Sequence, residues 1–152
     1  MSITRLSYRS RINFSTMTLS FDEEIERILS RSRTNNAKAG LTGALLLAGN
    51  TFLQMIEGPE PVVLEALDRI SADPRHGDFA IIDQRTDTAR LMPADPLFFC
   101  DASDACDSVL SSLYIPIAHS PELVRYDDLV SVMIFSATRV ARRHLRNRAL
   151  SA

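Results

Sequence analysis

The sequence contains no tryptophan and only five glycines and two cysteines among its 152 residues. Cys100 and Cys106 have a C-x5-C spacing that matches no common zinc motif, and cysteines of a cytosolic chain usually stay reduced. We therefore expect neither a metal site nor a disulfide. No apolar run approaches the ~20 residues that a membrane span needs. The formal net charge of -2 gives no reason to expect nucleic acid or an acidic membrane surface as a partner.

The N-terminal segment carries charge where a signal peptide would need an apolar core, so we expect the protein to remain in the cytoplasm. Hydrophobic residues make up 45% and charged residues 24% of the chain, as in ordinary globular proteins. The length suits one domain with an appended segment, and no internal repeat or low-complexity linker divides it.

The beginning of the chain predicts a strand followed by a helix. Apolar and polar residues alternate over residues 3–8, which is typical of a half-buried strand. Ser20 and Glu23 then have the spacing of a capping box, and Gly40 is a suitable end for the helix. The inner face of this helix is expected to hold Ile25, Ile28, Leu29 and Ser32.

A hairpin and a second helix follow. The apolar runs 41–48 and 51–58 are joined by a Gly-Asn pair, which predicts a tight turn because both residues tolerate positive φ. Prolines after the second run suit the first turn of a helix, and the Asp-Pro pair at 73–74 ends it. Its inner face would hold Val63, Leu67 and Ile70.

Residues 79–84 predict another strand, and residues 95–100 a further one. Pro93 and Pro96 would confine this last strand to an edge of the sheet or delay its start. The order β-α-β-β-α-β, with an added strand, indicates an α+β fold. We expect a ferredoxin-like arrangement with two helices on one face of a mixed sheet.

Beyond residue 100 the pattern is helical, so we divide the chain into a domain of residues 1–100 and a helical extension of residues 101–152. A short helix is expected within 101–114, and a long one from Ser120 as N-cap with Pro121 at N1. The apolar stripe of the long helix would hold Leu129, Val132, Met133, Ser136 and Val140. The arginines that suit the negative pole at its end are Arg139, Arg142, Arg143, Arg146 and Arg148. An exposed apolar stripe would favour homo-oligomers or partner binding.

Gln54 is a polar residue in the middle of the apolar run 51–58. Without partners in a core, its amide would cost about 1–3 kcal/mol. Alternation along the strand puts Gln54 on the same face as Phe52. If Tyr8 of the first strand faces the same side, Tyr8 and Gln54 can approach each other between the sheet and the helices.

Further residues would border the same space. Ile28 and Ile70, from the inner faces of the two helices, could clamp a flat object from both sides. The polar residues expected just past the ends of the two helices are Asn36, Asp73, Arg75 and His76. Taken singly, these are ordinary core, turn and helix-exit residues. Together, apolar walls with a few convergent polar groups indicate a small-molecule site.

Four separated motifs, "LSYRS", "SRTNNAKAGLTGALL", "FLQMIEGP" and "ISADPRH", resemble in order and spacing those of the BLUF domain, a flavin-binding blue-light sensor module. The match covers roughly residues 3–100. The resemblance implies a ferredoxin-like fold with a flavin held between the two helices. The expected cofactor is FAD, with FMN or riboflavin as alternatives.

The resemblance also implies roles for single residues. Tyr8 would donate an electron and a proton to the photoexcited flavin, and Gln54 would bridge Tyr8 and the N5/C4=O edge of the ring. Light would reorient or tautomerise the Gln54 amide and shift the flavin absorption slightly to the red. Asn36 would bond the C4=O/N3 edge. The positions matched to other flavin contacts are Ile28, Ser32, Asn35, Phe52, Ile70, Asp73, Arg75 and His76.

The chain departs from the family pattern in its last strand. The usual R-x-F-x-x-W-x-M falls, without gaps, on residues 90–97, so that Asp95 takes the tryptophan position and Leu97 the methionine position. Leucine can replace the bulk of methionine but not its sulfur contacts, and a carboxylate cannot replace an indole beside a flavin ring.

The leading interpretation is a non-enzymatic blue-light photoreceptor, whose helical extension passes the signal to an unknown partner protein or a neighbouring subunit. A light-insensitive interaction module with a degenerate last strand is the main alternative. A small acylphosphatase-like enzyme fits less well, because the segment after the first strand lacks a glycine-rich phosphate cradle.

Overall fold

The computed structural model describes residues 2–93, 95–101 and 108–151, with only the backbone for residues 108–111, 139–148, 150 and 151. The strands are β1 (Ile3–Ile12), β2 (Thr42–Ala48), β3 (Thr51–Gly58), β4 (His76–Asp87) and β5 (Phe98–Asp101). The α-helices are α1 (Phe21–Ala39), α2 (Glu60–Ala72), α3 (Ser108–His119) and α4 (Tyr126–Ser151). Short 3-10 turns η1 (Phe14–Thr16) and η3 (Pro121–Leu123) lie before α1 and α4.

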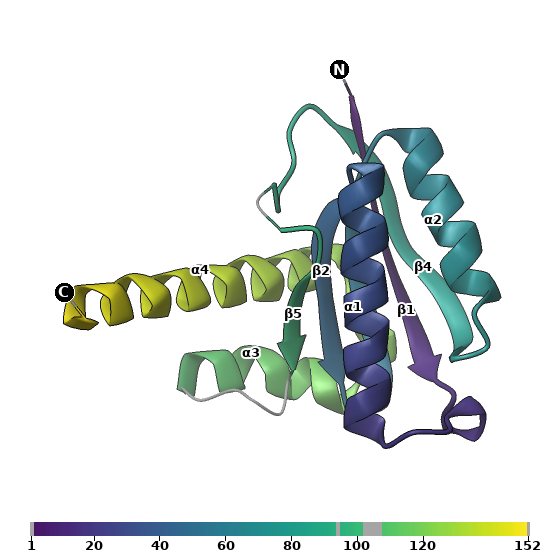
Figure 1. Ribbon diagram of the computed structural model, residues 1–152, viewed down its shortest axis with the longest axis horizontal. Coiled ribbons are helices and arrows are strands. Elements are labelled where there is room, and N and C mark those ends of the chain that lie inside the picture. Colours follow the sequence, from purple (N-terminus) through teal and green to yellow (C-terminus); the bar gives the residue numbers. More distant parts are fainter. Residues whose placement is uncertain (1, 94, 102–107, 152) are drawn as a thin grey trace.

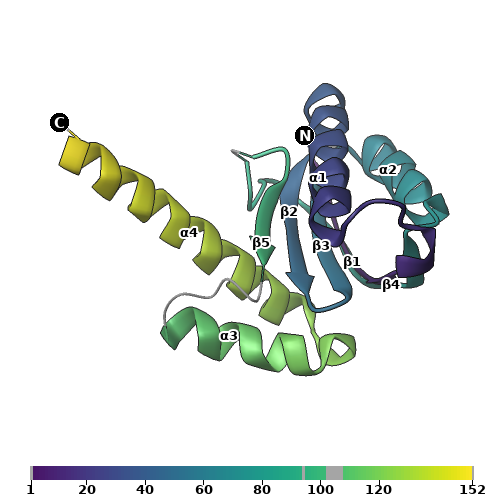
Figure 2. The same cartoon turned by 60° about the horizontal axis from the view of Figure 1, so that its bottom comes forward.

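The five strands form one mixed sheet in the order β4-β1-β3-β2-β5. All pairs are antiparallel except β2 with β5, which is parallel. Helices α1 and α2 lie side by side over one face of this sheet, while α3 and α4 lie on the other side (Figures 1 and 2). The α+β, ferredoxin-like fold expected from the sequence is therefore confirmed.

Local signals fix both ends of α1 where the sequence predicts them. Ser20 caps the first turn in a complete capping box with Glu23, and Gly40 ends the helix with a φ of 72°. The expectation that Asn36 lies past this helix is wrong, because Asn36 sits in its last turn. The reason is that Ala37, Lys38 and Ala39 are good helix formers and extend the helix to Gly40.

The C-terminal helices differ from the expected boundaries. Part of the short helix expected within 101–114 lies outside the described residues, and α3 continues to His119. The long helix does not begin at Ser120, because Pro121 starts the 3-10 turn η3 instead. Helix α4 begins at Tyr126, where the Asp128 carboxylate accepts the Arg125 backbone N–H at 3.2 Å. This acidic first turn is the true start signal.

Hydrophobic residues are buried on both faces of the sheet. The side under α1 and α2 includes Leu6, Ile28, Leu29, Phe52, Ile56 and Val63. The opposite side packs Leu46, Leu53 and Met55 of the sheet against the expected α4 stripe, of which Leu129, Val132 and Met133 are buried. The stripe is thus covered by the sheet up to Ser136, whereas the side chain of Val140 and those of Arg139, Arg142, Arg143, Arg146 and Arg148 lie outside the described residues.

Cys100 is a buried free thiol between the sheet and α4, and Cys106 lies outside the described residues. Burial raises the pKa of Cys100 to about 12, so the thiol stays protonated. Within the described ranges, no group of histidine, cysteine and acidic side chains is suited to a metal ion. None of the helices in those ranges combines the length and the apolar character that crossing a membrane requires.

Strands β1 and β4 extend further than residues 3–8 and 79–84, because the alternation continues beyond Tyr8, with Ser10 and Ile12 buried, and β4 pairs with β1 along this added length. Strand β5 starts only at Phe98, after the two prolines, and occupies the sheet edge as expected.

Gly43 marks the closest approach within the hairpin. A Cβ atom there would lie 2.0 Å from the Met55 carbonyl oxygen, so Gly43→Ala must distort the β2–β3 pairing. We expect this variant to lower the free energy of unfolding by about 1–3 kcal/mol, measured by urea denaturation. Gly77→Ala is the control, since its Cβ would meet only the Arg11 carbonyl oxygen at an ordinary 3.8 Å. Equal stability of the two variants would contradict the steric explanation.

Candidate functional site

The candidate site is built around two residues that face each other on neighbouring strands. The β1–β3 register puts Tyr8 opposite Gln54, and both side chains point toward the helices α1 and α2. Tyr8 is 1% and Gln54 5% exposed, and the Tyr8 hydroxyl donates a hydrogen bond to Oε1 of Gln54. The ring of Tyr8 also stacks on Phe79 with centroids 4.7 Å apart, which holds the phenol in place.

The Tyr8 hydroxyl is held in its neutral form. Burial, and next the negative charge of Asp73, raise its pKa far above the usual range. Tyr8 is therefore a hydrogen-bond donor at every physiological pH, and Gln54 must accept through its carbonyl oxygen. The Gln54 amide nitrogen lies at the cavity wall without a hydrogen bond to the described residues, so it retains two donors for a ligand.

One cavity lies over this pair, between α1 and α2. All the residues singled out from the sequence line it, namely Tyr8, Ile28, Ser32, Asn35, Asn36, Phe52, Gln54, Ile70, Asp73, Arg75 and His76. Ile28 comes from α1 and Ile70 from α2, so the two helices contribute apolar groups to opposite walls. Separate sequence motifs thus converge on one slot with apolar sides and a polar floor.

Three further residues line the cavity that sequence reasoning missed. Leu45 lies directly opposite Gln54 on β2, while Arg31 and Arg69 come from α1 and α2. Helical spacing offered a signal for Arg31, which stands three residues after Ile28. Neither Arg31 nor Arg69 forms an ion pair or a hydrogen bond within the described part of the chain.

Asn36 is buried and partly engaged. Its amide nitrogen donates to the Pro96 carbonyl oxygen at 2.9 Å, which joins α1 to the segment before β5. Its side-chain carbonyl oxygen has no hydrogen bond to the described residues, so it can accept one from a ligand in the cavity.

The segment before β5 packs next to residues that line the cavity, although none of its described residues is itself part of the lining. Leu97, at the methionine position of the family pattern, is fully buried beside Ile28 and Phe52 and so contributes apolar bulk. Asp95, at the tryptophan position, is not among the lining residues. Its carboxylate accepts the Leu97 backbone N–H at 3.0 Å, so Asp95 shapes the chain rather than the cavity.

Asp73 and Arg75 form an ion pair just after α2. The Arg75 Nη2 lies 2.6 Å from the Asp73 Oδ2, and the Arg75 Nε is 3.0 Å from Oδ1. Burial alone would raise the pKa of Asp73, but the hydrogen bonds and charge of Arg75 outweigh burial and lower it. Asp73 is thus ionised and neutralises Arg75, whereas Arg31 and Arg69 line the cavity without an ion pair to any described residue.

His76 closes the end of the cavity near Tyr8. Its Nδ1 lies 2.6 Å from the Ser10 hydroxyl, and its ring packs edge-on to Tyr8 at 6.3 Å. Burial lowers the pKa of His76; the charge of Asp73 opposes this shift and that of Arg75 adds to it. The imidazole is therefore neutral around pH 7.

Comparison with known proteins shows to which family the chain belongs. The model of the BLUF family, described as sensors of blue-light using FAD, matches residues 3–95. This chain belongs to the BLUF family. The cavity between α1 and α2 is therefore the candidate site of a member of a flavin-binding family of blue-light sensors.

Relatives of the BLUF chain include proteins with other parts attached. Over 94 residues it is 29% identical to the photoactivated adenylate cyclase subunit beta of Euglena gracilis, and this stretch covers 62% of the chain and 10% of that protein. Over 74 residues it is 36% identical to the blue light- and temperature-regulated antirepressor BluF of Escherichia coli (strain K12), covering 49% of the chain and 17% of BluF. The matched part is thus a small fraction of these relatives.

A solved structure of similar size also resembles the BLUF chain. The dark-state structure of BlrB, a BLUF protein, shares 29% identity and a TM-score of 0.68. The match covers 89% of this chain and 97% of BlrB, so the similarity extends beyond residues 3–95 into the C-terminal helices.

The lowered pKa of His76 predicts an acid-sensitive fold. An unfolded histidine takes up a proton as the pH falls through about 6.5, whereas folded His76 resists, so the unfolded chain binds more protons there. The free energy of unfolding should therefore decrease below about pH 6.5 and level off once the folded pKa has been passed. In His76→Gln this part of the pH dependence should disappear.

Denaturation of both proteins over a pH series measures the difference. His119→Gln is the control, since His119 is exposed at the end of α3. A pH dependence that is the same in His76→Gln and the parent protein would contradict the assignment.

Proposed function

We propose that this protein is a blue-light photoreceptor that binds a flavin non-covalently in the cavity between α1 and α2. The observation that carries the proposal is the buried Tyr8–Gln54 hydrogen bond at the cavity floor, beside an amide nitrogen that has no hydrogen-bond partner among the described residues. No fully buried polar side-chain atom of the described residues lacks a hydrogen bond, so this nitrogen reaches the open cavity, where the acceptors of a ligand can take the place of water. A flavin offers acceptors at N5 and C4=O, and these fit the donor set.

The remaining contacts also suit a flavin ring. Ile28 and Ile70 would hold its two faces, and the carbonyl oxygen of Asn36, which no described residue bonds, would accept the N3–H. When bound, the flavin supplies blue-light absorption and an excited state able to accept an electron. The chain supplies a neutral, buried phenol as the donor, with its proton directed at Oε1 of Gln54.

The switch would be the carboxamide of Gln54. An electron lost from Tyr8 makes its phenolic proton acidic, and Oε1 of Gln54 is the group positioned to receive it. Rotation or tautomerisation of the amide then exchanges donors and acceptors toward the ligand, which is the property that distinguishes an amide from an apolar residue. The changed hydrogen bonds would shift the flavin absorption slightly to the red.

The output would pass through α3 and α4 to a partner protein or a second copy of the chain, without an enzymatic step in residues 1–152. We further propose that the protein acts in the cytoplasm. The alternative of a light-insensitive interaction module is motivated by Asp95 and Leu97 at the tryptophan and methionine positions.

Absorption spectra of the purified protein, in the dark and under blue light, test the proposal. A yellow protein with a reversible red shift is expected, and a colourless protein would support the alternative.

Gln54→Leu should keep the bound flavin but lose the shift, and Tyr8→Phe should block the normal photoreaction in transient absorption. The exposed Gln84→Leu serves as the matched control and should behave as the parent protein. An unchanged shift in Gln54→Leu would contradict the role of this amide.

The charge of the cavity favours a phosphorylated flavin, FAD or FMN, over riboflavin. Arg31 and Arg69 reach the cavity from both helices and have no ion pair among the described residues. Each exposed arginine should contribute about 0.2–1 kcal/mol to the binding of a phosphate. The double variant Arg31→Ala/Arg69→Ala should therefore bind FMN about tenfold more weakly at low salt.

Fluorescence titration of the flavin-free protein with FMN and with riboflavin measures the effect. Riboflavin affinity should stay unchanged in the double variant. Arg27→Ala/Lys38→Ala removes two exposed charges of α1 that do not line the cavity and should leave both affinities as they are. Equal losses for FMN and riboflavin would contradict a phosphate contact.

A further inference from the structure

A buried ion pair lies on the face of the sheet opposite to the cavity. Arg5 of β1 and Glu57 of β3 are partners in the β1–β3 register, three residues away from Tyr8 and Gln54 along the same two strands. The Arg5 Nε lies 3.0 Å from the Glu57 Oε2, and the two side chains are 2% and 0% exposed. The pair therefore lies between the two strands that carry Tyr8 and Gln54 and the elements that pack on the other face of the sheet.

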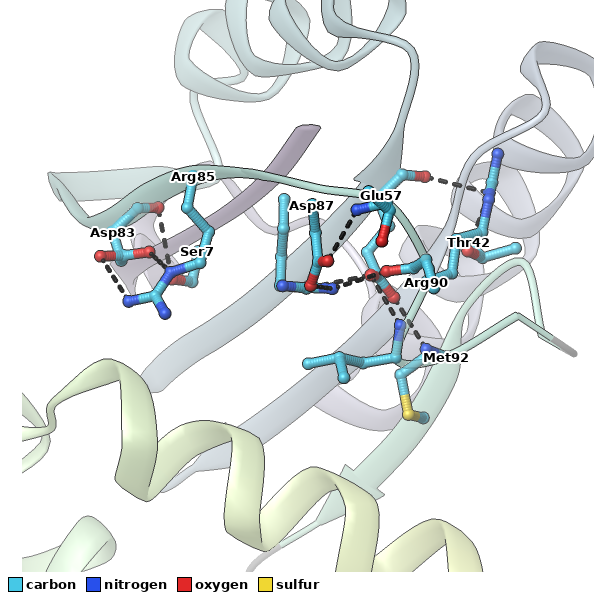
Figure 3. A network of polar contacts seen from close by, with 12 residues as sticks. Ser7, Thr42, Glu57, Asp83, Arg85, Asp87, Arg90 and Met92 are labelled. Carbon is cyan, nitrogen blue, oxygen red and sulfur yellow. Dashed lines mark hydrogen bonds and ion pairs between the residues drawn. The ribbon is translucent and has the colours of Figure 1, made fainter. Parts of the chain in front are cut away.

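Glu57 holds the segment that leads to β5. Its carboxylate accepts the backbone N–H of Leu91 at 2.8 Å and of Met92 at 2.7 Å (Figure 3). A few residues later the Pro96 carbonyl oxygen accepts a hydrogen bond from the side-chain amide of Asn36, which lines the cavity. Leu91 and Met92 are thus held by Glu57, and Pro96 is held by the cavity-lining side chain of Asn36.

Arg5 extends the connection to α4. Its Nη1 donates to the hydroxyl of Tyr126 at 3.2 Å, and its Nη2 bonds Asp87 and the Ala89 carbonyl oxygen, both at 3.0 Å. The guanidinium of Arg85 lies 3.6 Å over the ring of Tyr126 and holds it from another direction. Because Tyr126 is the first residue of α4, the ion pair fixes the base of that helix.

A displacement at the first turn of α4 would move the whole helix. The helix has 26 residues, which at 1.5 Å per residue gives a length of about 39 Å. Its first turns pack on the sheet, and its far end extends beyond the edge of the sheet (Figures 1 and 2). A small displacement at Tyr126 is therefore magnified at the far end.

We propose that Arg5 and Glu57 are positioning residues that couple the hydrogen-bond state of the cavity to the orientation of α4. Two connections from the cavity converge on Glu57, one along β3 from Gln54 and one through the segment from Asn36. A displacement of Glu57 would move Arg5, and Arg5 would move Tyr126 through the hydrogen bond to its hydroxyl. The Arg5–Glu57 pair at the centre of this network is buried and has few alternative arrangements, so a shift of Glu57 is passed to Arg5 rather than taken up by solvent. This inference rests on the proposed light-sensing function.

Hydrogen exchange of the flavin-loaded protein, in the dark and under blue light, tests the coupling, with the red shift recorded on the same samples. In the parent protein, illumination should change exchange at the amides of Leu91 and Met92 and at the first turns of α4. In Tyr126→Phe, the red shift and the change at Leu91 and Met92 should remain. The change in α4 should fall about threefold or more, the factor expected for one hydrogen bond of ordinary strength.

Glu57→Gln should retain the red shift but lose the light-dependent change at both places, and Tyr126→Phe keeps the proposal testable if Glu57→Gln does not fold. Tyr114→Phe is the matched control, because it removes a hydroxyl 2.6 Å from Ser136 of α4 without touching the ion pair. It should behave as the parent protein. An unaltered light response of α4 in Tyr126→Phe, or a red shift without any response of α4 in the parent protein, would overturn the coupling. A parent protein with no red shift would overturn the light-sensing function and the coupling together.

Discussion

The antiparallel register of β1 and β3 is the constraint on which the rest of the molecule depends. It sets Tyr8 beside Gln54 on one face of the sheet and Arg5 beside Glu57 on the other. Because side chains alternate along a strand, a slip of β3 by one residue would turn Gln54 into the opposite core and Glu57 toward α1 and α2, away from Tyr8 and Arg5. Both pairs are buried, so either misplacement would leave polar groups without partners.

The two faces place different demands on these pairs. On the cavity face, Gln54 and Asn36 keep hydrogen-bonding groups that no described residue uses and that open into the cavity, where a ligand can bind them. On the opposite face, the carboxylate of Glu57 receives Arg5 and two backbone amides. Breaking such a pair from one side typically costs about 3–5 kcal/mol, because the remaining charge stays buried. The side chains on the cavity face can thus exchange hydrogen-bond partners, whereas Glu57 and Arg5 on the opposite face keep theirs.

Features encoded by neighbouring residues could be predicted from the sequence. Both ends of α1, the hairpin turn, and the stop after α2 follow from caps, a Gly-Asn pair and an Asp-Pro pair. The start of α4 was misjudged, because Ser120 and Pro121 suit a 3-10 turn as well as a helix. The Arg5–Glu57 pair could not be predicted, since its burial requires both the register of strands distant in sequence and a cover from the C-terminal helices. Arg31 and Arg69 were missed because exposed helical arginines are usually only solvated.

The straight, uninterrupted course of α4 away from the sheet has a consequence for anything held at its far end. Successive residues of an α-helix rotate by about 100° around the axis. The direction in which a bound or fused module faces would therefore depend on the helix length with a period of 3.6 residues. An insertion of seven residues would nearly restore this direction, whereas an insertion of two would turn the module to the opposite side of the helix axis. Helical phase, and not reach alone, would then determine which module can respond to this domain.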